Sequence, residues 1–360
     1  MDKNKITILC SGVALGVYIP GISLNYQLTK MGYKTEVVVL ENLIKDDIKG
    51  KLGDTKKAFH DNFRLAQMGQ KMARGIDPSL DQNKLEYLFS QWRYNGENHF
   101  VVLSGFWISI LEKYKKLIKS DSCKIDIVHM DSVASPSWKS FAGTIKATRT
   151  LYLFEYEKNK LHYHLKVTSQ RPIAFEQREN RFLIHGGGWG MGTYKSKIKQ
   201  CEQRGQLLDV MAYYENELPT EKTSNRFFMV DPHWNPWIKN NSNEHTFPPM
   251  AHVIDAKNPH YTNRPEYHEL FYIGAQNKAI ISKPGGSTLI DSFASATPIV
   301  FIDPFGPHES YNAALWEDLG FGLSYEKWEK ADFSDKILFN CYNNILKAYD
   351  TVPDFMENYS

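Results

Sequence analysis

The sequence has few cysteines, no long hydrophobic run and almost no net charge. Its four cysteines, in 360 residues, are far apart and form no Cys-x-x-Cys pair, which argues against a disulfide scaffold or a zinc ribbon. No run of about 18 apolar residues occurs, so no membrane-spanning helix is predicted. The net charge of +2 lacks the basic excess of a typical nucleic-acid binder. Together these absences predict a cytoplasmic protein with reduced thiols, no bound metal and no nucleic-acid partner.

The residues that are present are typical of a folded α/β protein. The apolar fraction is 42% and the charged fraction 23%, ordinary values for a globular chain. Residues 6–10 and 35–40 have the apolar composition of strands buried on both faces. A glycine-bearing loop and a helix over residues 22–31, ended by Gly32, connect them. This order forms a βαβ unit and therefore implies a parallel sheet.

The same alternation returns in the second half of the chain. Strands are predicted at residues 181–185, 207–213, 226–230, 278–282 and 298–303. In the first half, residues 54–73 and 101–118 are predicted to be helical, and residues 124–130 to be a strand. A length of 360 residues allows two domains at roughly 150 residues each. We predict two doubly wound Rossmann-like domains facing across a cleft, residues 1–172 and 173–360, with the last helix able to pack back on the first domain.

A glycine-rich run, HGGGWGMG from His185 to Gly192, lies between a predicted strand and a predicted helix. Glycines such as Gly187 and Gly188 allow a ligand to approach the backbone closely, and the helix N-terminus favours a phosphate. The run matches a dinucleotide fingerprint imperfectly, because Met191 stands where its last glycine would be. The alternative interpretation is a tight turn without a ligand.

A second loop follows the strand at residues 278–282 and is more informative. It contains four residues suited to bind phosphate, Gly285, Gly286, Ser287 and Thr288. Asp291 follows about one helical turn later, so its carboxylate can accept hydrogen bonds from ribose hydroxyls in the same cleft. His308 and Glu309 follow the next strand, and loops at successive strand ends converge on one edge of a doubly wound sheet. This arrangement predicts a nucleotide-sugar pocket.

The segment from Lys283 to Gly320 resembles the C-terminal part of two-domain UDP-glycosyltransferases of the GT-B fold. The shared features are the Gly-Gly-Ser-Thr turn, the acidic residue before the strand at 298–303 and the polar pair before Asn312. The run at 185–192 resembles the glycine loop of plastid galactolipid synthases. Residues 12–39 are similar to the family's first βαβ unit, as in the N-acetylglucosaminyltransferase that makes peptidoglycan lipid intermediates. The resemblance spans about residues 6–322, in order, across both predicted domains.

The resemblance implies a donor site and an acceptor site. In the second domain, Gly187, Gly188 and the residues of the Gly285–Thr288 turn would hold the diphosphate, and Asp291 the ribose. His308 and Glu309 would hold the donor sugar. Trp234 and Trp237 lie where the family places the uracil ring and are candidates for stacking on it, although a surface loop anchored by buried tryptophans is the alternative. The first domain would bind the acceptor, without a tightly bound cofactor.

The general base of the family is missing. In the related families a histidine stands three residues before the first Pro-Gly, and here that position is Val17. Asp131 and His129, at the end of a first-domain strand, are the candidate catalytic residues, since strand alternation would place both on one face. The alternative is that His129 packs within the sheet and Asp131 caps the next segment. Retaining enzymes often have two glutamates eight residues apart here, and Lys283 replaces the first, so inversion is favoured.

The sequence therefore predicts a UDP-dependent hexosyl- or N-acetylhexosaminyltransferase with an unidentified small-molecule, peptide or lipid acceptor. Two alternatives remain: a UDP-sugar 2-epimerase of the same fold, and a degenerate protein that binds UDP-sugars without transfer. Peripheral contact with the inner face of a membrane is a further hypothesis, carried by the apolar and lysine-rich stretch at 106–119, which can equally be a helix covering the sheet. The sequence makes no prediction of the oligomeric state.

Overall fold

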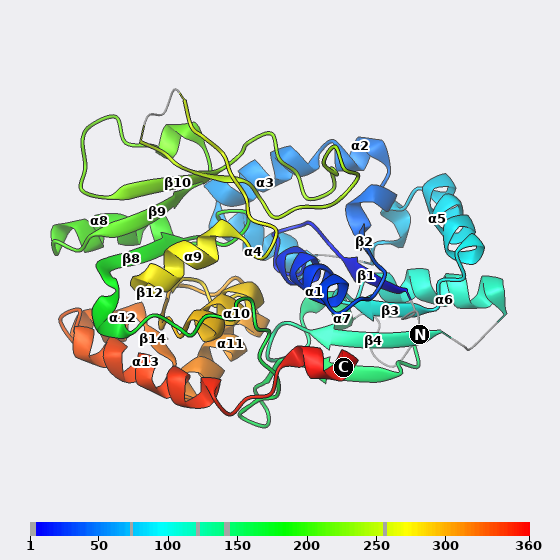
Figure 1. Cartoon of the computed structure of the whole chain (residues 1–360). Coiled ribbons are helices and arrows are strands. Elements are labelled where there is room, and N and C mark those ends of the chain that lie inside the picture. Colours follow the sequence, from blue (N-terminus) through cyan, green and yellow to red (C-terminus); the bar gives the residue numbers. More distant parts are fainter. Residues whose placement is uncertain (1–4, 73–74, 120–122, 140–144, 255–257) are drawn as a thin grey trace.

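Two parallel sheets form the framework of the molecule (Figure 1). The computed structural model describes residues 5–72, 75–119, 123–139, 145–254 and 258–360. The first sheet has the order β2-β1-β3-β4-β5 and is parallel throughout. Its strands are β1 (Ile6–Cys10), β2 (Thr35–Val39), β3 (His99–Val102), β4 (Lys124–His129) and β5 (Arg149–Tyr152). All five residues of β1 are buried, as expected of a central strand covered on both faces.

The second sheet has the order β11-β10-β9-β8-β12-β13-β14, and only the edge strand β11 is antiparallel. Its strands are β8 (Glu179–His185), β9 (Leu208–Ala212), β10 (Arg226–Val230), β11 (Met250–His252), β12 (Asn277–Ser282), β13 (Ile299–Phe301) and β14 (Gly322–Ser324). A small hairpin, β6 (Phe154–Glu155) with β7 (Lys160–Leu161), lies between the two sheets in the sequence. The prediction of two doubly wound α/β domains is confirmed, whereas the boundary at 172/173, between β7 and β8, stays a prediction.

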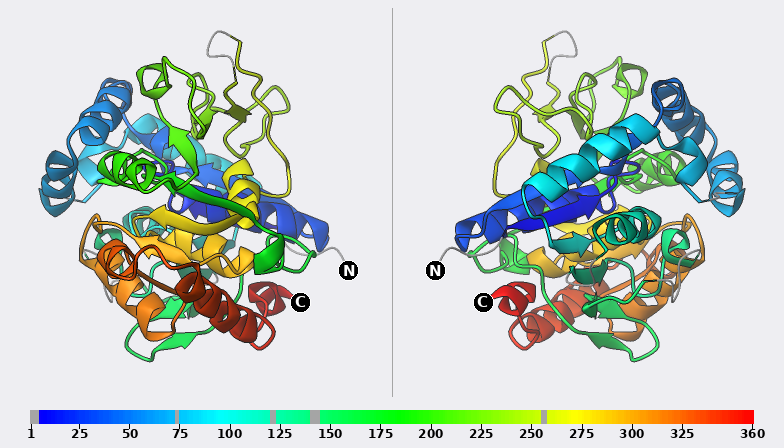
Figure 2. Two further views of the ribbon diagram at one scale, coloured as in Figure 1. Left: turned by 90° about the vertical axis from the view of Figure 1, so that its left-hand side faces the viewer. Right: turned by 90° about the vertical axis from the view of Figure 1, so that its right-hand side faces the viewer.

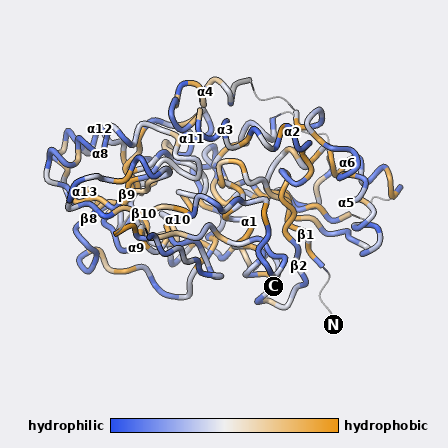
Figure 3. The backbone as a smooth tube through the Cα atoms, turned by 90° about the horizontal axis from the view of Figure 1, so that it is seen from above, coloured by the Kyte–Doolittle hydropathy of each residue, from blue (hydrophilic) through white to orange (hydrophobic). Residues whose placement is uncertain are grey.

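Helices cover the faces of both sheets (Figure 2). Those of the first domain are α1 (Tyr18–Lys30), α2 (Asp46–Lys49), α3 (Leu52–Asp61), α4 (Phe63–Met72), α5 (Gln82–Tyr94), α6 (Trp107–Ile118) and α7 (Pro136–Lys139). Those of the second are α8 (Tyr194–Gln203), α9 (Glu269–Gln276), α10 (Gly286–Ser295), α11 (Pro307–Asp318), α12 (Tyr325–Lys330) and α13 (Asp335–Tyr349). Figure 3 shows hydrophobic residues along β1 and β2, and these strands contribute buried side chains to the apolar core.

Two of the predicted helices are wrong in part. The stretch 101–118 is not one helix, because β3 occupies its beginning and only α6 is helical. An apolar run of this kind fits a buried strand as well as a buried helix, and periodicity alone does not separate them. The stretch 54–73 contains two helices, α3 and α4, separated at Asn62, which has extended backbone angles. Ala73 lies outside the described residues.

The last residues reach from the second domain back to the first. Helix α13 packs against β12 and α10 of the second sheet. The 3₁₀ helix Phe355–Tyr359 then contacts α1, and the backbone carbonyl of Tyr359 accepts a hydrogen bond of 2.7 Å from the hydroxyl of Tyr33. The C-terminus accordingly lies against the first domain (Figures 1 and 2).

Candidate active site

A cleft of about 730 Å³ lies between the two domains. Its lining includes residues that directly follow strands of both sheets: Ser11 after β1, Asp131 near the end of β4, Gly187 after β8 and Lys283 after β12. The strand order reverses between β1 and β3 in the first sheet and between β8 and β12 in the second. Ligands of doubly wound sheets bind beyond the carboxyl ends of strands at such points. The cleft is therefore the candidate active site.

The glycine loop after β8 is pressed between the two domains. Gly187 has a φ of 73°, and a Cβ on Gly188 would lie 2.4 Å from the carbonyl oxygen of Ala14 in the first domain. A side chain at either position would strain the backbone or collide with the opposing loop. The backbone N–H of Gly187 donates to Nδ1 of His185 over 3.0 Å. Burial, with a smaller contribution from nearby Lys283, lowers the pKa of His185 to about 3, so this imidazole is neutral at pH 7.

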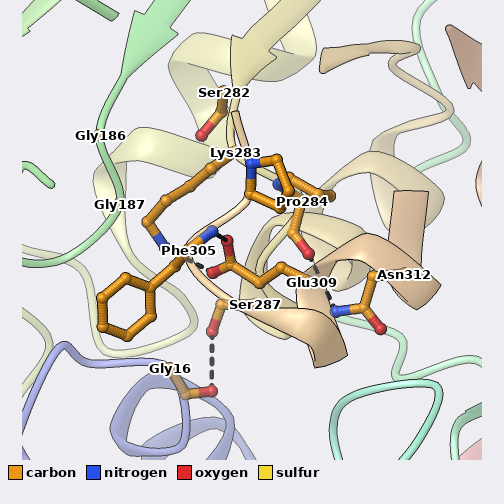
Figure 4. A network of polar contacts seen from close by, with 12 residues as sticks. Gly16, Gly186, Gly187, Ser282, Lys283, Pro284, Ser287, Phe305, Glu309 and Asn312 are labelled. Atoms are coloured by element: carbon orange, nitrogen blue, oxygen red, sulfur yellow. Dashed lines mark hydrogen bonds and ion pairs between the residues drawn. The ribbon is translucent and has the colours of Figure 1, made fainter. Parts of the chain in front are cut away.

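The turn after β12 brings a lysine between the two glycine loops (Figure 4). The ammonium of Lys283 donates to Oε1 of Glu309 over 2.7 Å and lies 3.3 Å from where a Cβ of Gly187 would be. Gly285 caps the N-terminus of α10, and the hydroxyl of Ser287 donates across the cleft to the carbonyl of Gly16 over 3.3 Å. Backbone N–H groups at a helix N-terminus together with a lysine form a site suited to a diphosphate.

Asp291 also lines the cleft and is held by a histidine. Its carboxylate oxygen Oδ1 lies 3.0 Å from Nε2 of His268, just before α9, and both side chains are buried. As a carboxylate in the lining of the cleft, Asp291 can accept hydrogen bonds from a ligand such as a pair of ribose hydroxyls. Thr288, one turn earlier on α10, lines the same part of the cleft.

His308 and Glu309 lie side by side on α11 but have different surroundings. His308 lines the cleft, with Nδ1 3.5 Å from the amide of Gln70 on α4. Glu309 is buried, and its two carboxylate oxygens accept from Lys283 and from the backbone N–H of Phe305, the latter over 2.6 Å. The contacts of Glu309 thus position Lys283, and its contact with donor-sugar hydroxyls stays a prediction.

Asp131 faces the turn after β12 from the first domain. Its Oδ1 accepts a hydrogen bond of 2.9 Å from the amide of Asn312 on α11 and lies 3.1 Å from where a Cβ of Gly286 would be. The same Asn312 amide donates to the carbonyl of Pro284 over 2.9 Å, and its oxygen accepts from the N–H of Ser132 over 2.7 Å. Asn312 thus connects the end of β4 to the turn after β12 and fixes the position of Asp131 beside this turn.

The prediction that His129 shares the cleft with Asp131 is wrong. Strand β4 ends at His129, so the alternation that would place both side chains on one face does not continue. The His129 ring stacks on Tyr152 at 4.1 Å between centroids and packs against Trp138, away from the cleft lining. Burial lowers its pKa to about 4, which leaves it neutral and enclosed at pH 7.

Trp234 and Trp237 both line the cleft, on the long connection between β10 and β11. Trp234 packs edge-on against Tyr18 of the first domain, with 5.7 Å between ring centroids. Their stacking on a nucleotide base stays a prediction.

The apolar stripe of α6 is mostly buried against the first sheet through Trp107, Ile110 and Leu111, so it belongs to the core.

Three residues that the sequence analysis did not assign to the site complete it: Lys283, His268 and Asn312. Lys283 enters the sequence argument only as the residue that replaces a glutamate, although a lysine before a Gly-Gly turn is itself suited to bind phosphate. His268 and Asn312 are remote in sequence from the carboxylates they hold, and no local pattern links them. Within the described residues, no group of His, Cys, Asp and Glu side chains could hold a metal ion, and no helix is long and apolar enough to cross a membrane.

Solved structures of glycosyltransferases have the same architecture. MurG of Acinetobacter baumannii superposes with a TM-score of 0.52 at 11% identity, covering 99% of this chain and 98% of that one. The glycosyltransferase VinC in complex with dTDP has a TM-score of 0.55 at 12% identity, covering 99% and 97%. At such identities the likeness establishes the fold alone, and the predicted GT-B fold is confirmed.

Sequence comparison yields a shorter match. The chain is 37% identical over 57 residues to a processive diacylglycerol β-glucosyltransferase of Staphylococcus aureus, in strains JH9 and Newman alike. The match spans 16% of this chain and 15% of the length of those curated relatives. No protein-family model matches the chain.

Proposed function

We propose that this GT-B chain is a glycosyltransferase that moves a hexosyl or N-acetylhexosaminyl group from a UDP-sugar to an acceptor, with inversion. The observation that carries the proposal is the meeting, at one switch point, of two glycine loops, the Lys283 ammonium and the Asp291 carboxylate, opposite Asp131 of the other domain. Each group has a counterpart in a nucleoside diphosphate sugar, namely the diphosphate, the ribose and the reacting carbon.

The geometry suggests how the chain would promote transfer. The N–H groups at the start of α10 and the Lys283 ammonium would stabilise the negative charge that develops on the departing diphosphate. Asp131, fixed by Asn312, would accept the proton of the attacking acceptor hydroxyl. Attack from the first-domain side, opposite the diphosphate, is a single displacement and inverts the anomeric carbon. Holding both substrates in line lowers the barrier further.

Val17 favours a second candidate, a UDP-sugar-binding protein without transferase activity. Val17 lines the cleft where related enzymes carry their basic histidine, and valine accepts no proton. If Asp131 does not replace that histidine, the donor site would remain while transfer is lost.

Calorimetry with UDP and dTDP, followed by incubation with UDP-sugars and cell extract, tests the proposal. We expect UDP to bind more tightly than dTDP, and free UDP to form only when an acceptor is present. UDP binding without transfer to any component of the extract would support the binding protein, and conversion of the donor sugar without acceptor would support the epimerase. Absence of nucleotide binding would refute the proposal.

A further inference from the structure

The first-domain wall of the cleft contains a lysine that the proposed chemistry does not use. Lys56 lies on α3, and Leu52, Lys56 and Phe59, which line the cleft, follow at the spacing of one helix face. The next residue, Lys57, pairs instead with Asp61 over 2.9 Å, and its ammonium lies 4.9 Å from the ring centroid of Tyr214. A cation in the middle of an apolar helix face is therefore directed to the cleft and not to solvent.

Lys56 differs from the other charged residues of the cleft in having no partner. Asp131, Asp231, Asp291 and Glu309 each accept a hydrogen bond from a neighbouring group, and Lys283 is paired with Glu309. Within the described part of the chain, neither an ion pair nor a hydrogen bond joins the Lys56 ammonium to another residue. Burial lowers the pKa of this ammonium, since its charge is partly removed from water without compensation. An anion placed beside it would supply the missing charge.

Helix α3 holds Lys56 in place because His60, one turn after Lys56 on this helix, anchors the helix to the second domain. The imidazole Nε2 of His60 lies 2.6 Å from Oε1 of Glu217 and 2.8 Å from the ammonium of Lys195. The ring packs on Gly190 of the glycine loop, where a Cβ would approach Nδ1 to 2.4 Å. Figure 1 shows α3 and α4 where the two domains meet. The lysine is thus presented by a fixed element, which reduces the ordering cost of binding.

The surroundings of Lys56 indicate what kind of anion it would meet. Leu52, Phe59 and Phe106 are apolar residues on the same first-domain side of the cleft, and Ser104 and Ser137 add hydroxyl groups to that side. A small inorganic anion would leave the apolar surface uncovered. An oxyanion attached to an apolar body would satisfy both features.

We infer that Lys56 binds an anionic group, a phosphate or a carboxylate, on an amphiphilic acceptor that lies along the first-domain wall of the cleft. The inference rests on the proposed function in identifying this ligand as the acceptor, but the anion site itself is independent of it. The ammonium would pair with the oxyanion, while Leu52, Phe59 and Phe106 cover the apolar part of the molecule.

Binding of hexyl phosphate, hexanoate and hexanol to the full chain tests the inference, with tryptophan fluorescence as the readout because Trp189, Trp234 and Trp237 line the cleft. We expect the chain to bind one or both anions at least tenfold more tightly than hexanol. Lys56→Met should abolish this preference and Lys56→Arg should retain it. Lys51→Met, which removes an exposed lysine at the N-terminus of the same helix and outside the cleft lining, should leave the preference unchanged. A preference for hexyl phosphate alone, or for hexanoate alone, identifies the oxyanion.

Equal binding of the anions and hexanol by the unaltered chain, or an unchanged preference in Lys56→Met, would overturn the inference. UDP is titrated separately into every variant. Loss of UDP affinity in Lys56→Met with hexyl phosphate binding retained would assign Lys56 to the donor diphosphate and also overturn it. An anion preference in a chain that binds no UDP would instead refute the proposed function and leave the Lys56 site standing. Thermal unfolding of each variant shows that it is folded.

Discussion

The two walls of the cleft differ in how their charges are compensated. On the second-domain wall, Lys283 is paired with Glu309 and Asp291 with His268, so the wall is preorganised before any ligand arrives. On the first-domain wall, Val17, Leu52 and Phe59 are apolar, and the ammonium of Lys56 has no partner among the described residues. The difference suggests that the second-domain wall recognises a polar ligand of fixed chemistry, whereas on the first-domain wall the proposed acceptor would supply the missing partner of Lys56.

Asp131 belongs to the first domain, but its carboxylate is held by Asn312 of the second domain. Replacing it is the most severe test of the difference between the walls. We expect Asp131→Asn to lower turnover roughly 10²–10⁴-fold, the usual effect of losing a general base, with UDP affinity unchanged. The measurement is turnover with the identified acceptor, alongside calorimetry with UDP. Asp231→Asn, which neutralises another carboxylate of the cleft, is the control, and near-normal turnover of Asp131→Asn would exclude Asp131 as the base.

Asp291 tests the second-domain wall. Charge-assisted hydrogen bonds to ribose hydroxyls contribute roughly 1.5–3 kcal/mol, so Asp291→Ala should weaken UDP binding tenfold or more. Asp335→Ala removes an exposed carboxylate paired with Lys278 in the same domain and should leave UDP affinity unaltered. If calorimetry gives the same UDP dissociation constant for Asp291→Ala and the unaltered chain, the ribose assignment is wrong.

His308 tests the edge where the walls meet, since Gln70 of the first domain approaches it. His308→Ala should reduce discrimination among UDP-sugars several-fold while affinity for UDP itself stays nearly constant. A thermal-shift series with UDP, UDP-glucose and UDP-N-acetylglucosamine measures both quantities. If His308→Ala weakens the binding of UDP and of the UDP-sugars equally, His308 contacts the diphosphate and not the sugar.

The same difference between the walls explains what the sequence could predict. Gly187 and Gly285 lie within three residues of a strand end, and Asp291 lies in the helix that follows the second of these loops. Their convergence therefore followed from the sheet topology and the local sequence. The first-domain wall depends on tertiary contacts. Helix α3 is fixed by His60 and Glu217, which are 157 residues apart, and no periodicity in the sequence indicates that pairing. His129 was misplaced because strand alternation was extended two residues past the end of β4.

His129 supplies the smallest expected effect, because it lies beside Asp131 in sequence but outside the cleft. His129→Phe keeps a ring of similar volume between Tyr152 and Trp138, so turnover and UDP affinity should stay within a few-fold of normal. Its consequence should appear instead in the pH dependence of stability. The folded-state pKa of His129 is about 4, below its ordinary value of 6.5, so the unfolded chain takes up a proton at this site first as the pH falls.

The free energy of unfolding therefore decreases as the pH drops from about 6.5 toward 4. His129 alone accounts for a decrease of roughly 1 kcal/mol between pH 7 and 5.5. His129→Phe removes that contribution, and urea unfolding at pH 7 and at pH 5.5 should show a smaller difference in the free energy of unfolding than the unaltered chain shows. His164 and His185, both buried with pKa values of about 3, continue to contribute in both proteins, so the pH dependence should be reduced and not abolished. If His129→Phe loses as much turnover as Asp131→Asn, His129 takes part in catalysis. The packed core of the first domain and its open wall could then no longer be treated as functionally separate.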